Sequence, residues 1–152
     1  MDITAYTDRS QAYGALLLRV SLGTVLLAHS LYLKLMVFTL AGTAQFFGSI
    51  GLPEWLAYLV FAMEVVGGTL LILGVQVRAV GLALLPILLG ATWAHSGNGW
   101  LFTAPNGGWE YPLFLAAMSA SVALLGAGAH ALAPALKRNL NPVGGKPTAN
   151  AG

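Results

Sequence analysis

The chain has 152 residues, of which 57% are hydrophobic and only 8% are charged; soluble domains have about 25% charged residues, so the composition excludes an ordinary soluble protein. Its mean hydropathy is +0.77 and its net charge is +2. The sequence contains no run of basic residues of the kind that binds a phosphate backbone, which excludes nucleic acid as a partner. The sequence contains no cysteine, so this chain cannot exchange disulfides.

Four apolar segments approach or exceed the length of about 20 residues that a helix needs to cross a bilayer. In chain order they are residues 13–35, 55–77, 79–95 and 111–132. We therefore predict an all-α integral membrane protein with the lipid bilayer as its main partner, in which residues 13–136 form an antiparallel four-helix bundle. Residues 1–12 are expected to form a cytoplasmic N-terminal segment, and residues 137–152 a flexible cytoplasmic tail.

The first apolar segment also has features of a signal peptide. Small residues in TLAGTA (residues 39–44) have the spacing of a cleavage site, but Lys34 interrupts the apolar run before it. We therefore expect the segment to be retained as a helix.

Basic residues in the short connections predict the orientation of the bundle. Lys34 is the one basic residue expected near the outer face. Both termini are therefore predicted to be cytoplasmic, because five of the seven Lys and Arg residues fall on the same side: Arg9, Arg78, Lys137, Arg138 and Lys146.

The two outer connections have distinct compositions. Residues 37–53 carry phenylalanines among Gly, Thr and Ser, which is typical of a short segment lying at the membrane interface. Residues 95–109 are rich in Gly, Asn and Pro. Trp93, Trp100 and Trp109 bracket this second connection, as an interfacial aromatic belt would.

Arg19 and Glu64 are charged residues deep within predicted helices. Counted from the cytoplasmic ends at 1.5 Å per residue, they lie roughly 9 Å and 13 Å deep, so the long Arg side chain can reach the carboxylate. A charged group in lipid costs about 2.5 to 3.5 kcal/mol, and a bidentate pair removes two of them. We therefore predict an ion pair between Arg19 and Glu64. Either it only clamps two helices, or it also serves function, as intramembrane ionisable groups usually do.

Helical periodicity places these charges on inward faces. At 100° per residue, Arg19 shares one face, about 60° wide, with Gly23, Ser30 and Lys34. Small residues beside charged ones allow helices to approach closely in lipid. The face that begins at Glu64 continues through Gly67, Gly68 and Leu71.

A second polar group is predicted near the outer surface, at His29, Lys34, His95 and Glu110. The helix dipole alone explains a Glu in a first turn, and a terminal Lys commonly extends to the interface. His29 is flanked by apolar residues and needs a polar partner. No Glu-x-x-His or His-x-x-x-His spacing supports a metal site, and haem ligation by the two histidines is equally unsupported.

Five short motifs resemble the DoxX family in order and spacing, over residues 16–128. They are LRVSLG (18–23), AHSLYLKL (28–35), GLP (51–53), EVVGGTLLILGVQVR (64–78) and GGWEYPLFLAA (107–117). The resemblance implies a four-helix bacterial inner-membrane protein, related to the DoxD subunit of a thiosulfate:quinone oxidoreductase and associated with membrane redox complexes. By position, the family's polar residues correspond to Arg19, Lys34, Glu64, His95 and Glu110. Two departures are Ser30, where the family usually has Gly, and the end of the fourth helix.

Two functions remain open. In the first, the protein is a subunit or partner of a quinone-linked redox system, and the headgroup enters between the helices. The residues expected to bind it are Arg19, His29, Lys34 and Trp93, and those expected to carry catalysis are Glu64, His95 and Glu110. In the second, the protein is a non-enzymatic subunit or small-solute carrier, whose buried charges clamp helices or line a path. The cofactor is left open, with quinone preferred to haem or metal, and other subunits or a homo-oligomer are compatible with both functions.

Overall fold

The computed structural model describes residues 3–132 and contains no strand within that range. The predicted all-α class is confirmed. The predicted tail at residues 137–152 lies outside the described part of the chain. The elements are α1 (Ile3–Leu27), the π-helix η1 (Ala28–Val37), α2 (Leu40–Ser49), α3 (Trp55–Leu73), α4 (Val77–Ala94), the 3-10 helix η2 (Ser96–Asn98) and α5 (Glu110–Leu125).

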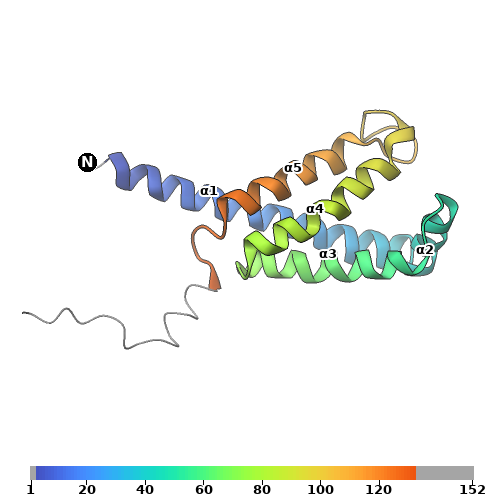
Figure 1. The fold of residues 1–152 in the computed structure, drawn as a ribbon, viewed down its shortest axis with the longest axis horizontal. Helices are drawn as coiled ribbons and strands as arrows, with labels where there is room; N and C mark the ends of the chain where they lie inside the picture. The colour runs from blue at the N-terminus through green and yellow to red at the C-terminus, as the bar shows by residue number, and fades with distance from the viewer. Residues whose placement is uncertain (1–2, 133–152) are drawn as a thin grey trace, which may run out of the picture.

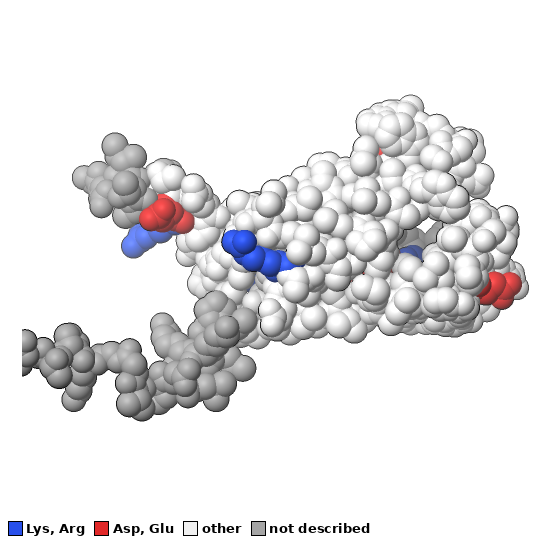
Figure 2. All heavy atoms as spheres, in the orientation of Figure 1, with Lys and Arg blue, Asp and Glu red and all other residues white. Residues whose placement is uncertain are grey.

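Three helical stretches are long and apolar enough to cross a membrane, namely Thr7–Val37, Trp55–Leu73 and Val77–Asn98. These stretches make the chain a multi-pass membrane protein in contact with lipid. The face of the molecule seen in Figure 2 carries very few charged groups along its helices, as a surface in contact with acyl chains requires. The first helix begins at Ile3, so residues 3–12 of the predicted N-terminal segment are helical and continuous with α1.

The fourth apolar helix, α5, is shorter than predicted and ends at Leu125 rather than at residue 132. It has 16 residues, about 24 Å at 1.5 Å per residue. Gly126 and Gly128 follow it with φ angles of 83° and 65°, left-handed values that favour glycine. The chain then turns back toward α1, where the Ala129 N–H donates to the Ala12 carbonyl at 2.9 Å.

The long helices associate as two close pairs, α1 with α3 and α4 with α5. Small residues allow both approaches. A Cβ on Gly23 would lie 2.6 Å from the Gly68 carbonyl oxygen, and a Cβ on Gly81 would lie 2.9 Å from the Ser119 carbonyl oxygen. Ser119 Oγ also donates to the Gly81 carbonyl at 2.8 Å. Each pair therefore depends on backbone contact, as helix packing in lipid often does.

The two pairs meet at one end of the molecule and separate toward the other (Figure 1). We call the end where α3 connects to α4 the closed end, and the end with α2 and residues 95–109 the open end. Side chains from all four long helices form the hydrophobic core, including Leu22, Leu71, Leu84 and Val122. At the open end, the space-filling view shows a hollow with a basic side chain inside it (Figure 2).

The first helix changes its winding from α to π at Ala28. In the π form each N–H bonds five residues back, and the Phe38 N–H donates to the Leu33 carbonyl in this way at 2.8 Å. Such segments are rare and are frequent at functional sites. This one carries His29, Ser30 and Lys34.

Candidate functional site

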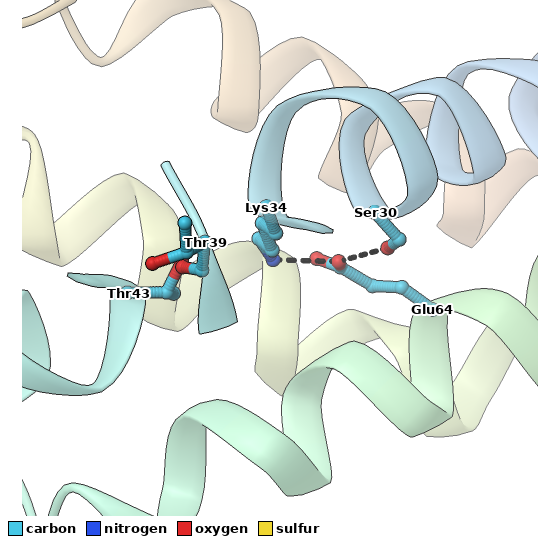
Figure 3. Close-up of polar contacts among 5 residues, drawn as sticks. All are labelled: Ser30, Lys34, Thr39, Thr43 and Glu64. Atoms are coloured by element: carbon cyan, nitrogen blue, oxygen red, sulfur yellow. Dashed lines mark hydrogen bonds and ion pairs between the residues drawn. The ribbon is translucent and has the colours of Figure 1, made fainter. Parts of the chain in front are cut away.

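Glu64, near the middle of α3, has its carboxylate bound by two side chains of the π-helix (Figure 3). Ser30 Oγ donates to Glu64 Oε2 at 2.6 Å, and Lys34 Nζ lies 2.5 Å from the same oxygen. Glu64 is only 6% exposed and Ser30 is fully buried. The ammonium thus neutralises a carboxylate that would be very costly to bury alone.

Arg19 does not pair with Glu64, so the predicted ion pair is wrong. The Arg19 side chain, 1% exposed, donates instead to five backbone carbonyls at 2.5 to 3.2 Å. The last carbonyls of a helix lack partners within it and carry partial negative charge, so they attract a guanidinium. The acceptors lie at the end of α3 and after α5, in Leu71, Ile72, Ala127, Ala129 and His130.

A cavity of about 670 Å³ lies between the two helix pairs. Its polar lining comes from four segments: His29 of η1, Glu64 of α3, His95 after α4 and Tyr111 of α5. The other lining residues are Leu26, Leu88, Ala91, Phe102, Gly107, Gly108, Pro112 and Leu115. The structure therefore brings together three of the residues expected to act on a ligand, within a largely apolar space.

One carboxylate oxygen of Glu64 accepts both of its hydrogen bonds. Ser30 and Lys34 both bind Oε2, and Oε1 accepts no hydrogen bond from the described residues. Within residues 7–132, no side-chain polar atom is both fully buried and unpaired. Oε1 has no hydrogen bond and therefore must keep some accessible surface. Glu64 is one of the residues that line the cavity.

His95 is oriented by the connection that follows it. Its Nδ1 lies 3.1 Å from the Asn106 carbonyl oxygen and 3.0 Å from that of Gly107. Carbonyl oxygens only accept, so Nδ1 carries the hydrogen, and in the neutral ring Nε2 is an acceptor. The Asn98 amide donates to the same two carbonyls, at 3.1 and 2.9 Å, and fixes the loop that holds the imidazole.

Aromatic contacts connect the two helix pairs at the open end. The His29 and Tyr111 rings are stacked, with centroids 5.5 Å apart and planes at 27°. The Phe46 ring of α2 lies 6.5 Å from the His95 ring, within the range of aromatic pair contacts. η1 thus contacts α5, and α2 contacts the end of α4, beside the cavity.

The remaining predicted site residues lie away from this cavity. Arg19 binds carbonyls at the closed end. Glu110 Oε1 accepts from the Phe102 N–H at 2.8 Å and lines a separate pocket of about 490 Å³ with Trp100 and Phe114. Trp93 is 57% exposed on the outside of α4.

Two residues were missed as site residues by the sequence analysis. Ser30 lies on the predicted inward face but was noted only as a departure from a family pattern, although its hydroxyl is a partner of Glu64. Tyr111 directly follows Glu110, and its place at the start of a helix gave no sign of a cavity. No group of three or more His, Asp or Glu side chains is placed to hold a metal ion within the described range.

Comparisons with known proteins agree with the motifs. The sequence model of the DoxX family matches residues 14–97. A Bacillus subtilis (strain 168) protein named "Putative oxidoreductase CatD" is 43% identical over 84 residues, which are 55% of this chain and 60% of that protein. No solved structure shows a significant match. The family match includes His29, Lys34, Glu64 and His95, whereas Tyr111 lies beyond it.

Proposed function

The chain belongs to the DoxX family of membrane proteins, and from this membership and the polar cavity we propose that it is a subunit of a quinone-linked membrane redox system. One observation supports this most directly. Glu64 has a carboxylate that is neutralised on one oxygen by Lys34, while its other oxygen is left for a ligand in a largely apolar cavity. The relative named as an oxidoreductase supports the redox class.

The cavity suits a ring-shaped, mostly apolar ligand with a few polar groups. Its volume of about 670 Å³ lies within the range of roughly 300 to 1,000 Å³ of small-molecule sites. Apolar side chains such as Leu26, Leu88 and Leu115 would contact the ring. Glu64 Oε1 and His95 Nε2 would hold its oxygen atoms and take up protons.

A quinol that binds here supplies two electrons and two protons. The electrons would pass to a flavin, haem or iron–sulfur group of a partner subunit. Lys34 would stay paired with Glu64 Oε2, which leaves Oε1 as the oxygen that accepts the proton. His29 and Tyr111 would position the ring by aromatic contact.

The proposed arrangement in the membrane has four antiparallel helices in the bacterial inner membrane, with both termini cytoplasmic. Arg9 and Arg78 belong to the expected cytoplasmic side. The open end then faces outward, with α2 at the membrane interface. In this arrangement a lipid-soluble ligand reaches the cavity from the outer leaflet.

The test is the quinone content of the full chain, purified from quinone-containing bacterial membranes and extracted with organic solvent. We expect quinone well above the amount in co-purified lipid for the wild-type protein, and a loss of roughly 10-fold in His95→Ala. Glu54→Gln is the matched control, because Glu54 is exposed and lies outside the cavity lining. Quinone no higher than the lipid background would contradict the proposal.

A second function, a non-enzymatic structural subunit, is favoured by the Arg19 contacts, which join three segments without facing the cavity. A purely structural chain should tolerate a change that preserves the buried charge balance. Replacing the ion pair by Glu64→Gln with Lys34→Met should then leave the partner complex fully active. A folded double variant that assembles with its partners but loses quinol oxidation would exclude this function.

A further inference from the structure

The fixed polar atoms available to a ligand in the cavity are hydrogen-bond acceptors. Glu64 Oε1 is a carboxylate oxygen without a partner among residues 7–132. His95 presents Nε2 as an acceptor in its neutral form, because Nδ1 donates to the Asn106 and Gly107 carbonyls. Both residues line the cavity, from α3 and from the end of α4.

The strongest donor nearby is the Lys34 ammonium, which uses one of its three N–H groups on Glu64 Oε2. Neither Lys34 nor Ser30 is among the residues that line the cavity. His29 and Tyr111 also line it, but a neutral imidazole and a phenol each donate and accept. These two residues can therefore bind either a hydrogen-bond donor or a hydrogen-bond acceptor on the ligand. Glu64 and His95 are the residues that distinguish between the two.

We propose that the cavity binds the reduced, dihydroxy form of a quinone-type ring in preference to the oxidised, dicarbonyl form. This inference rests on the proposed function and assigns Glu64 Oε1 and His95 Nε2 as the acceptors for ligand hydroxyl groups. A hydroxyl hydrogen satisfies a carboxylate oxygen in an apolar space. A ligand carbonyl at the same place has no hydrogen to donate, so its lone pairs repel those of the carboxylate and the buried acceptor stays unpaired.

The preference should be on the order of 10-fold in Kd, as expected when one hydrogen bond to a charged group is made in one state and lost in the other. Selective binding of the reduced form also raises the reduction potential of the bound couple. A 10-fold preference corresponds to about 30 mV for a two-electron couple. The site would thus hold the electron-rich form until a partner removes the electrons.

The test measures the Kd of decylubiquinol and of decylubiquinone by anaerobic equilibrium dialysis against the full chain in nanodiscs, with empty nanodiscs as background. We expect decylubiquinol to bind about 10-fold more tightly to the wild-type protein. In Glu64→Gln the ratio should fall toward one, because the amide can donate to a carbonyl. Glu54→Gln, also a loss of carboxylate charge at the α3 helix, should keep the wild-type ratio.

A second variant covers the case in which Glu64→Gln alone does not fold. Glu64→Gln combined with Lys34→Met leaves no unpaired charge, and its ratio should also fall toward one. Equal binding of both forms to the wild-type protein, or tighter binding of decylubiquinone, overturns the inference while the proposed function stands. Binding of neither form above the empty nanodiscs, as for a cavity that takes only lipid chains, overturns both.

Discussion

Lys34 Nζ lies 2.5 Å from Glu64 Oε2 and joins the π-helix to α3, with the two side chains 18% and 8% exposed. The pair occupies one carboxylate oxygen and leaves the other for the cavity. The packing contact of Glu64 and its proposed ligand contact therefore fall on separate atoms, Oε2 and Oε1.

Lys34→Met should destabilise the protein strongly, because it leaves a buried carboxylate without a counter-charge. We expect a loss of about 3 kcal/mol, measured as thermal unfolding in detergent by circular dichroism. Adding Glu64→Gln should recover most of this loss. Arg9→Gln, which removes an exposed charge on α1, should have little effect, and an equally large loss there would argue against the pair as the cause.

Arg19→Leu and Glu64→Leu should have additive effects on stability, because the two side chains share no contact. Residues without shared partners usually add within about 0.5 kcal/mol. Double-variant unfolding experiments measure this directly. If the double variant loses much less stability than either single variant, the result would support the predicted ion pair between Arg19 and Glu64, which the structure contradicts.

Arg19→Lys should fail to replace Arg19. A guanidinium presents five donors in a planar fork, whereas an ammonium is a compact charge with three, and the five carbonyls belong to separate segments. We expect a lower melting temperature and faster proteolysis within residues 126–132. Wild-type protease resistance in Arg19→Lys would show that the charge alone suffices.

Gly23→Ala should weaken the contact between α1 and α3. The added Cβ would lie 2.6 Å from the Gly68 carbonyl oxygen and 2.9 Å from Ile72 Cγ1, and such overpacking costs about 1 to 3 kcal/mol. Gly14→Ala in the same helix is the control, because a Cβ there meets nothing within 4 Å. It should be neutral or slightly stabilising. Equal melting temperatures for the two variants would argue against a close crossing at Gly23.

Ala91→Phe should fill the cavity without changing its charge. We expect the affinity for decylubiquinol to fall by more than about 10-fold, with the melting temperature unchanged or higher, since filling a cavity stabilises. Ala79→Phe, on the exposed side of α4, should leave binding intact. Unaltered binding in Ala91→Phe would place the ligand elsewhere.

The helical class and the inward faces could be predicted from the sequence. The spacing of Arg19, Gly23 and Ser30 follows the α-helical period, and the structure buries all three. Membership in the DoxX family was also apparent from the order of the motifs, and the family match confirms it. These features depend on local periodicity and short patterns, which the sequence carries directly.

The partners of the buried charges could not be predicted. Depth along a helix brought Arg19 and Glu64 to similar levels, but a long side chain can extend toward either end. Arg19 extends toward backbone carbonyls at the end of α3 and after α5. The π-helix also changes the phase of the side chains after Leu27, which a constant 100° per residue does not include. The end of α5 depends on a turn against α1, a contact distant in sequence.

The carbonyls bound by Arg19 have a consequence for how a ligand could enter. They belong to α3 and to the segment after α5, so one side chain of α1 fastens both helix pairs at the closed end. At the opposite end the pairs are joined by ring contacts, of His29 with Tyr111 and of Phe46 with His95. A lipid-soluble ring that enters sideways from the bilayer would have to separate these ring contacts. The buried Arg19 guanidinium would meanwhile hold the closed end together.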